Sequence, residues 1–116
     1  MTDTNILLAR LLKSRQSKLK VGEYTFIVRR PTAYEAALLF QNDPTQYDVA
    51  RDYVDDWDGV KDKDLIPSGG NDPAEFHKTL WAEWLSDNPD LWGPIFDCVV
   101  NSYQAYKGKV EDEGKD

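Results

Sequence analysis

The side chains best suited to chemistry lie in one acidic stretch, Asp55 to Asp64, around Gly59. Oxygen ligands spaced two apart before a glycine open the calcium loop of an EF-hand. With Gly59 at the sixth position of such a loop, Val54 and Leu65 occupy the first and twelfth positions, which require carboxylates. The stretch therefore does not encode an EF-hand, and we expect a solvated turn. A small metal-binding regulator that uses the Asp55–Asp64 loop is kept as an alternative. Its ligands would be Asp56, Asp58, Asp62 and Asp64.

Side chains for nucleophilic or acid–base catalysis do not form a recognisable set. The single histidine, His77, follows Phe76 in a tryptophan-rich stretch, and we expect it at the border of the core. The chain has no Gly-x-Ser-x-Gly elbow, no Gly-Lys-Ser/Thr phosphate loop and no dinucleotide fingerprint. No pair of carboxylates is singled out for acid and base work. The sequence predicts a protein that is not an enzyme, with no catalytic residue, no cofactor and no metal site.

The charge balance restricts the class of partner. The 116-residue chain carries 21 acidic and 14 basic residues, a net charge of −7, whereas nucleic-acid binders concentrate Lys and Arg to displace counterions. The local basic residues are interpreted as solvated surface: Lys13, Arg15, Lys18, Lys20, Arg29 and Arg30.

The lone Cys98 cannot form an intramolecular disulfide, which favours a reducing compartment. We find neither an apolar run of about 18 residues nor a signal-peptide cleavage site. We expect a cytoplasmic protein without a nucleic-acid or membrane partner.

Two elements are predicted near the start of the chain, a helix and a β-hairpin, and they would position any binding surface formed there. Leucines recur at helical spacing after a polar stretch that can supply an N-cap, which predicts a first helix over residues 4–15. Alternation of period two follows and predicts a β-hairpin over residues 18–30. Gly22 and Glu23 would form its type II′ turn. The hairpin face formed by Leu19, Val21, Tyr24 and Phe26 must then pack on helices or on another strand.

Capping signals predict four further helices. Thr32 with Glu35, Asp43 with Gln46, and Asp72 with Glu75 have the spacing of a capping box, and Asn88 precedes Pro89. The predicted helices span residues 32–41, 44–56, 73–86 and 89–106, and the last is the most apolar. Residues 58–71 lack periodicity and predict a long surface loop. The predicted fold class is α+β, mainly α, with about five helices and one N-terminal β-hairpin. One domain covers residues 1–106, followed by a disordered acidic tail at 107–116.

Exposed apolar side chains would make this protein a binding module. The leucine-rich first helix, the hairpin edge and any exposed tryptophan are the candidates for a surface that contacts another protein. At least two of the tryptophans are expected in the core. The candidate protein-binding residues are Leu7, Leu8, Leu11, Tyr24, Phe26, Trp57, Trp81 and Trp84.

Three short motifs occur in an order that resembles the phage tail assembly chaperones, small proteins encoded before the tape-measure gene of long-tailed phages. The hairpin ends in Arg and Pro, over residues 26–31. A Trp-Asp-Gly-Val segment follows at Trp57 to Val60, and a late Asn-Pro-x-Leu helix start lies at Asn88 to Leu91. The ordering covers most of residues 18–106.

The resemblance implies a function in virion assembly. It implies a protein that binds the long helical tape-measure protein and helps to recruit tail-tube subunits, in the cytoplasm of the host. Its partners would be the tape-measure protein and the tail-tube protein, and formation of a homo-oligomer is left open. The alternative from the same surfaces is a structural minor virion or tail component.

Overall fold

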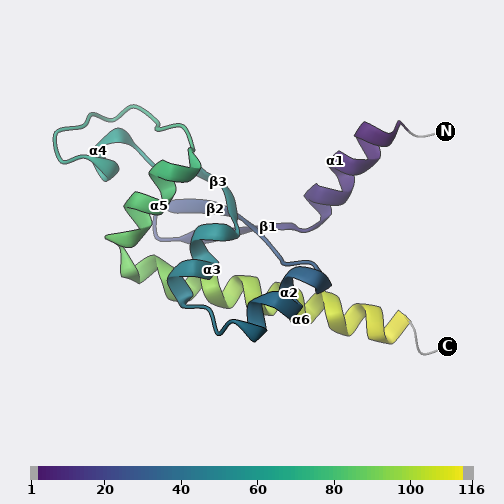
Figure 1. The fold of residues 1–116 in the computed structure, drawn as a ribbon. Helices are drawn as coiled ribbons and strands as arrows, with labels where there is room; N and C mark the ends of the chain where they lie inside the picture. The colour runs from purple at the N-terminus through teal and green to yellow at the C-terminus, as the bar shows by residue number, and fades with distance from the viewer. Residues whose placement is uncertain (1–2, 114–116) are drawn as a thin grey trace.

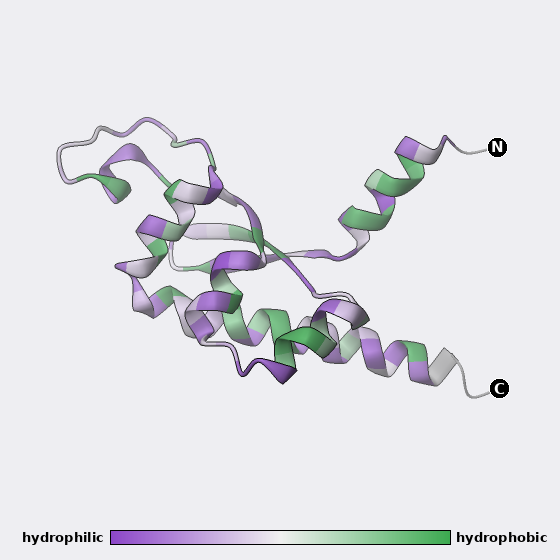
Figure 2. Cartoon of the chain, viewed as in Figure 1, coloured by the Kyte–Doolittle hydropathy of each residue, from purple (hydrophilic) through white to green (hydrophobic). Residues whose placement is uncertain are grey.

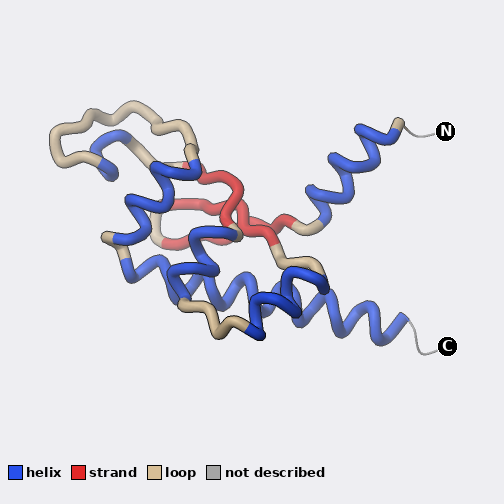
Figure 3. The backbone as a smooth tube through the Cα atoms, viewed as in Figure 1, coloured by secondary structure: helices blue, strands red, loops and turns tan. Residues whose placement is uncertain are grey.

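The elements of the computed structural model, which describes residues 3–113, follow the predicted fold class, an α+β fold that is mainly α (Figure 1). Figure 3 shows three short strands that helices pack against. The elements are α1 Thr4–Ser14, β1 Gln16–Val21, β2 Tyr24–Arg29, α2 Ala33–Gln41, α3 Gln46–Asp52, β3 Val54–Asp58, α4 Asp62–Leu65, α5 Lys78–Ser86, the 3-10 helix η1 Pro89–Leu91 and α6 Trp92–Glu113.

Strands β1 and β2 form the predicted hairpin in the predicted register. Val21 lies opposite Tyr24, and Leu19 lies opposite Phe26. Gly22 has a φ of 61° while Glu23 keeps a negative φ, as a type II′ turn requires. Phe26 is fully buried and the other three side chains pack against the core. The apolar face of the hairpin therefore rests on the helices, as expected.

A third strand completes the sheet where the sequence predicted the end of a helix. β3 pairs antiparallel with β2, so the strand order is β1-β2-β3. The predicted helix over residues 44–56 is therefore confirmed for Gln46–Asp52 and wrong in its C-terminal part, because α3 ends at Asp52. Pairing with β3 satisfies the second edge of β2, and it buries Val54 and Trp57 against the helices. These tertiary contacts outweigh the helical spacing of the apolar residues.

Two predicted helix starts are also wrong. The capping box of α3 is formed by Thr45 and Asp48, whereas Asp43 adopts a φ of 47° in the preceding turn. α5 begins at Lys78, where the exposed His77 ring nitrogen accepts a hydrogen bond from the Thr79 N–H at 3.2 Å. His77 is therefore an exposed cap, not a residue at the core border.

Residues 72–74 do not form a helix because their backbone forms hydrogen bonds with residues 60–62. The Ala74 N–H donates to the Val60 carbonyl at 2.9 Å, and the Asp62 N–H donates to the Asp72 carbonyl at 3.0 Å. Helix formation from residue 73 would break these bonds. Within the predicted surface loop at 58–71, the short helix α4 forms instead of a continuous irregular segment.

The C-terminal prediction is wrong for most of its length. α6 continues to Glu113, so residues 107–113 are helical and not disordered, and residues 114–116 lie outside the described part of the chain. The guanidinium of Arg30, which directly follows β2, stacks 3.5 Å from the centre of the Tyr106 ring. This contact connects the C-terminal half of α6 to the end of the hairpin. The Thr32–Glu35 capping box of α2 is confirmed.

A cluster of aromatic side chains fills the space between the sheet and α5. Trp81 is fully buried, and its ring centre lies 5.2 Å from that of Phe26, 6.2 Å from that of Trp57 and 6.0 Å from that of Trp84. Its indole N–H donates to the Ala50 carbonyl at 3.2 Å. α6 packs against α3 and the hairpin, which agrees with its predicted central place.

A charged network at the end of the hairpin connects β2 to α2, α3 and β3. Arg29 donates to Glu35 at 3.1 Å and to the Asp52 carbonyl at 2.9 Å, and it lies 3.5 Å from an Asp55 oxygen. Its guanidinium also lies 4.5 Å from the centre of the Tyr53 ring. Burial raises the pKa of Tyr53 to about 12, and the Glu35 carboxylate adds to this rise.

Glu35 should make the protein sensitive to acid. Burial alone would raise the pKa of Glu35, but bonds from the Thr32 backbone and from Arg29 lower it below its ordinary 4.5. A lowered folded-state pKa contributes stability that is present above the unfolded value and is lost as the pH falls through the folded value. We therefore expect the stability difference between wild type and Glu35→Gln, measured by urea unfolding, to be constant above about pH 5 and to shrink below about pH 4.5. Parallel curves down to about pH 3 would contradict this assignment.

Gly59 brings β3 against the hairpin turn. It has a φ of 86°, and a Cβ on it would lie 2.6 Å from the Glu23 carbonyl oxygen, whereas a Cβ on Gly22 meets nothing within 4 Å at a φ of 61°. Both alanine variants carry the strain of a positive φ, but only Gly59→Ala adds a backbone clash. We expect Gly59→Ala to cost about 1–2 kcal/mol more than Gly22→Ala in thermal unfolding. Equal costs would show that the close approach relaxes freely.

Candidate protein-binding surface

Helix α1 stands away from the body of the molecule (Figure 1), and Figure 2 colours several of its residues as hydrophobic. None of its residues is buried. The five large apolar side chains retain between 45% and 57% of their exposure: Ile6, Leu7, Leu8, Leu11 and Leu12. The predicted helix is thus confirmed, and its leucines have no partner within the described chain.

Four of these side chains share one side of α1. With 3.6 residues per turn, Leu7, Leu8, Leu11 and Leu12 follow each other at i, i+1, i+4 and i+5, whereas Ile6 points to the opposite side. We call these four residues the leucine stripe. Asp3 caps the helix by accepting from the Asn5 N–H at 2.7 Å. Asp3 at the N-terminus of the helix and Lys13 in its last turn both interact favourably with the helix dipole.

The leucine stripe is the feature that requires a partner. An isolated helix of about a dozen residues is marginal in water, and most helices in proteins are stabilised by packing of one apolar face. α1 has 11 residues and no such packing. Covering apolar surface stabilises by roughly 25 cal/mol per Å². A second apolar helix laid along the stripe would therefore order both segments.

The other candidate residues do not lie on this surface. Tyr24 is half-buried against Trp84, whereas Phe26, Trp57, Trp81 and Trp84 are buried in the aromatic cluster, at 9% exposure or less. The assignment of the four buried residues to a docking surface is therefore wrong for the folded protein, since a partner cannot reach them without opening the core. Only the leucines of the predicted set lie on one exposed surface.

Three exposed apolar residues of α2 are not among the binding residues predicted from the sequence. Tyr34, Leu38 and Phe40 retain 73%, 43% and 58% of their exposure. The signal was available, because residues 33–40 have too many apolar side chains for the single buried position, Ala36, that the helix uses.

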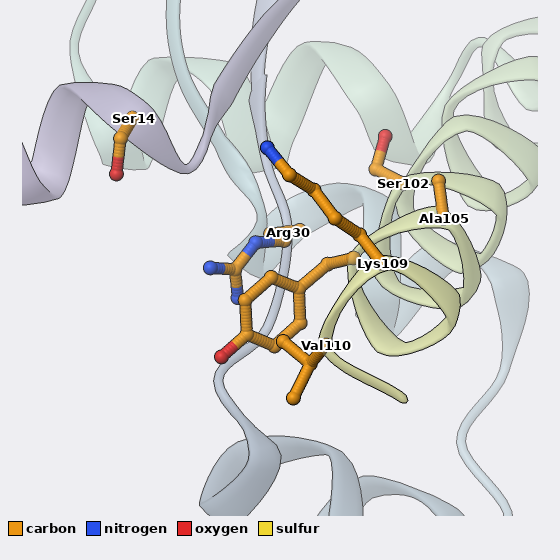
Figure 4. Close-up of a pocket in the computed structure, with 7 residues that line it drawn as sticks. Ser14, Arg30, Ser102, Ala105, Lys109 and Val110 are labelled. Carbon is orange, nitrogen blue, oxygen red and sulfur yellow. The ribbon is translucent and has the colours of Figure 1, made fainter. Parts of the chain in front are cut away.

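A cleft of about 480 Å³ separates the end of α1 from the C-terminal half of α6 (Figure 4). Its lining combines cationic and apolar side chains: Ser14, Arg30, Ser102, Ala105, Tyr106, Lys109 and Val110. Ser14 follows Leu7 and Leu11 at i+7 and i+3, so that side of α1 overlooks the cleft. Tyr106 and Val110 are also exposed, at 38% and 47%. The cleft extends the leucine stripe onto α6.

The carboxylates of the acidic stretch support the backbone and its neighbours. Asp55 accepts from Gln16 at 3.0 Å, Asp56 accepts from the Trp57 N–H at 2.8 Å, and Asp64 accepts from the Lys61 N–H at 2.9 Å. Among the side chains that the structure describes, those of residues 3–111, no three of Asp, Glu, His or Cys lie close enough to hold a metal ion. Nothing in this geometry favours the alternative of a metal-binding regulator.

The residues that carry the family resemblance shape the fold. The indole N–H of Trp57 donates to the Ala74 carbonyl at 2.7 Å. Gly59 has a positive φ beside the hairpin turn, and Val60 is buried. Asn88 donates to the Trp84 carbonyl at 2.7 Å, and Leu91 is buried. These motifs therefore position α5 and α6, and none of them forms an exposed site.

Comparison with known proteins adds no family or activity. No family model matches the sequence, and no curated protein or solved structure shows significant similarity to the chain. Within the described residues, no helix has the length and apolar content needed to cross a bilayer.

Proposed function

We propose that this chain is a non-enzymatic phage tail assembly chaperone that binds the tape-measure protein and helps to recruit tail-tube subunits in the host cytoplasm. The observation that carries the proposal is the uncovered leucine stripe on α1. The order of the hairpin, Trp57–Val60 and Asn88–Leu91 motifs supports the same family.

The leucine stripe suits a client that is itself a long amphipathic helix. Such a client aggregates through its apolar face, and α1 offers an apolar strip of two helical turns that covers part of that face. The net charge of −7 on the chaperone keeps the complex dispersed through mutual repulsion. Several copies along the client would cover it until tube subunits replace them.

Co-expression with the neighbouring tape-measure protein tests the proposal. Segments of that protein, produced alone and with this chain, are compared for the fraction that stays soluble and co-purifies. We expect at least one helical segment to become soluble only with this chain present. If no segment of the tape-measure protein binds, the proposal fails.

Quantification in purified particles separates the chaperone from a minor virion component. A chaperone leaves before assembly is complete, so we expect none of this chain in mass spectra of gradient-purified particles. A stoichiometric amount in mature particles would favour the structural alternative, and the leucine stripe would then be an interface of the virion.

A further inference from the structure

Strand β1 lies at the edge of the sheet, and one side of its backbone has no partner within the described chain. The strand order is β1-β2-β3, so β1 pairs with β2 alone. The two-residue turn makes Val21 and Tyr24 a hydrogen-bonded pair, and such pairs alternate along an antiparallel ladder. The N–H and C=O groups of Gln16, Lys18 and Lys20 therefore point away from β2. No backbone hydrogen bond among the described residues reaches them.

Most of the devices that protect the edge of a sheet are missing from β1. Proteins guard an exposed edge with a short strand, a proline, a bulge, a covering element or charged side chains. β1 has six residues without a proline, and its pairing with β2 is regular throughout. Ser17, Lys18 and Lys20 are exposed, so the described elements leave this edge open. The edge is guarded by the charge of its two lysines, which discriminates between partners by sign.

The charge of this edge favours an acidic strand over a second copy of β1. Leu19 and Val21 pack against the core, so Lys18 and Lys20 project from the opposite face of the strand. A second copy that added its own β1 would bring lysines against lysines, and like charges opposite each other destabilise a strand pair. An acidic strand would instead form pairs of opposite charge there.

A small pocket lies beside the start of the same edge. It has a volume of about 150 Å³ and is lined by Lys13, Gln16, Ser17, Lys18 and Ile27. Ile27 lies opposite Lys18 on β2 and supplies an apolar wall. When a peptide adds to a sheet as a strand, main-chain hydrogen bonds give affinity and pockets for alternate side chains give specificity. The edge of β1 offers both features.

The other edge of the sheet lacks this combination. Asp56 and Asp58 are exposed on β3, so the charge at that edge is negative. The Val54 carbonyl at the start of β3 accepts a hydrogen bond from the Lys78 ammonium at 3.0 Å. An acidic strand is therefore repelled at β3 and attracted at β1.

We propose that β1 accepts an extended acidic segment of a partner protein as a fourth strand of the sheet. The main chain of the segment bonds to Lys18 and Lys20, and acidic side chains two residues apart lie beside the two lysines. An aliphatic side chain two residues further on occupies the pocket at Gln16. In antiparallel pairing the segment reads acidic-x-acidic-x-aliphatic. The inference does not rest on the proposed function, because β1 and the leucine stripe share no residue.

NMR titration of the full chain with a synthetic peptide tests the inference. The probe is the acetylated and amidated peptide Thr-Glu-Thr-Glu-Thr-Leu-Thr, and the comparison peptide has lysine in place of both glutamates. With the glutamate peptide, the amide signals of Lys18 and Lys20 should shift and become protected from hydrogen exchange. The lysine peptide should bind about tenfold more weakly or worse.

Methylation of the peptide backbone separates strand addition from a contact between charges alone. In the proposed pairing the N–H groups of both glutamates face β1, whereas those of the threonines beside them face solvent. N-methylation of the glutamates should therefore abolish binding. N-methylation of the two threonines that follow the glutamates should leave the affinity within about threefold of the parent peptide.

Variants of the chain provide the reverse test. Lys18→Glu with Lys20→Glu should lose about tenfold or more in affinity for the glutamate peptide and gain affinity for the lysine peptide, which loss of the fold would not produce. Lys63→Glu with Lys107→Glu is the matched control, because both residues are exposed, lie outside the sheet and make the same change in net charge. This variant should bind both peptides as the wild type does.

Three results would overturn the inference. The first is an absence of amide shifts at Lys18 and Lys20 with the glutamate peptide at millimolar concentration. The second is equal binding of the parent peptide and the peptide methylated at its glutamates, which would show a contact between charges without strand addition. The third is protection of the Lys18 and Lys20 amides in the protein alone, which would show that a second copy occupies the edge.

Discussion

A Trp81→Ala variant is expected to lose about 3–5 kcal/mol of stability, which is a large part of the roughly 5–15 kcal/mol that holds a domain of this size. Trp81 is fully buried, three aromatic rings lie within 6.2 Å of its ring centre, and its N–H satisfies the Ala50 carbonyl. Removal of the indole leaves both a cavity and an unpaired carbonyl. Equilibrium urea unfolding, followed by circular dichroism, measures the loss.

Tyr34→Ala provides the comparison for the core variant. Tyr34 is also aromatic but is 73% exposed on α2, so its removal should change the free energy of unfolding by less than about 0.5 kcal/mol. A loss below about 1 kcal/mol for Trp81→Ala would mean that the aromatic cluster is not the core of the protein.

The Leu8→Asp, Leu11→Asp variant is expected to lose client binding by a factor of about 100 or more. A buried leucine contributes about 1.5–3 kcal/mol, and each factor of ten in affinity corresponds to about 1.4 kcal/mol. The variant should unfold at the same urea concentration as the wild type, because α1 contributes no buried residue to the body. Isothermal titration with a helical segment of the tape-measure protein measures the change.

Ile6→Asp is the matched control for the stripe variant. Ile6 is 57% exposed, close to Leu7 and Leu8, and lies on the same helix but on its other side. We expect its affinity for the client to stay within about threefold of the wild type. An equal loss in both variants would mean that disruption of the helix, and not of the stripe, weakens binding.

Local patterns were sufficient where neighbouring residues determine the structure. The turn at Gly22 and the alternation on both sides of it determined the hairpin register without long-range information. The Thr32–Glu35 box predicted the start of α2, and the spacing of the leucines predicted α1, for the same reason. In both cases the signal and the helix lie within a few residues of each other.

The wrong predictions concern segments whose structure depends on distant partners. Residues 54–58 have apolar spacing that suits a helix, but β2 offers an unpaired edge, and the segment pairs with it. Pro73 follows a good capping residue, but its segment bonds to residues 60–62 instead. Short-range rules do not include such pairings.

The candidate site shows the same division between local and distant information. The spacing of the leucines predicted a helix with one apolar side, but whether another element covers that side depends on the tertiary arrangement. The burial of Trp57, Trp81 and Trp84 depends on how the sheet and α5 come together, so the sequence could not separate core tryptophans from surface ones. The excess of apolar residues over 33–40 was a signal for an exposed surface on α2, but the choice of Ala36 as its buried position depends on the same arrangement.

Hydrogen exchange of the α1 backbone, with and without client, tests the central claim most directly. In the free protein, the amides of residues 7–14 should exchange almost without protection, because no other described element covers α1. With a helical tape-measure segment bound, the same amides should become strongly protected while those of the aromatic core change little. Protection that appears elsewhere in the complex, with α1 still exchanging freely, would contradict the assignment of the leucine stripe as the client-binding surface.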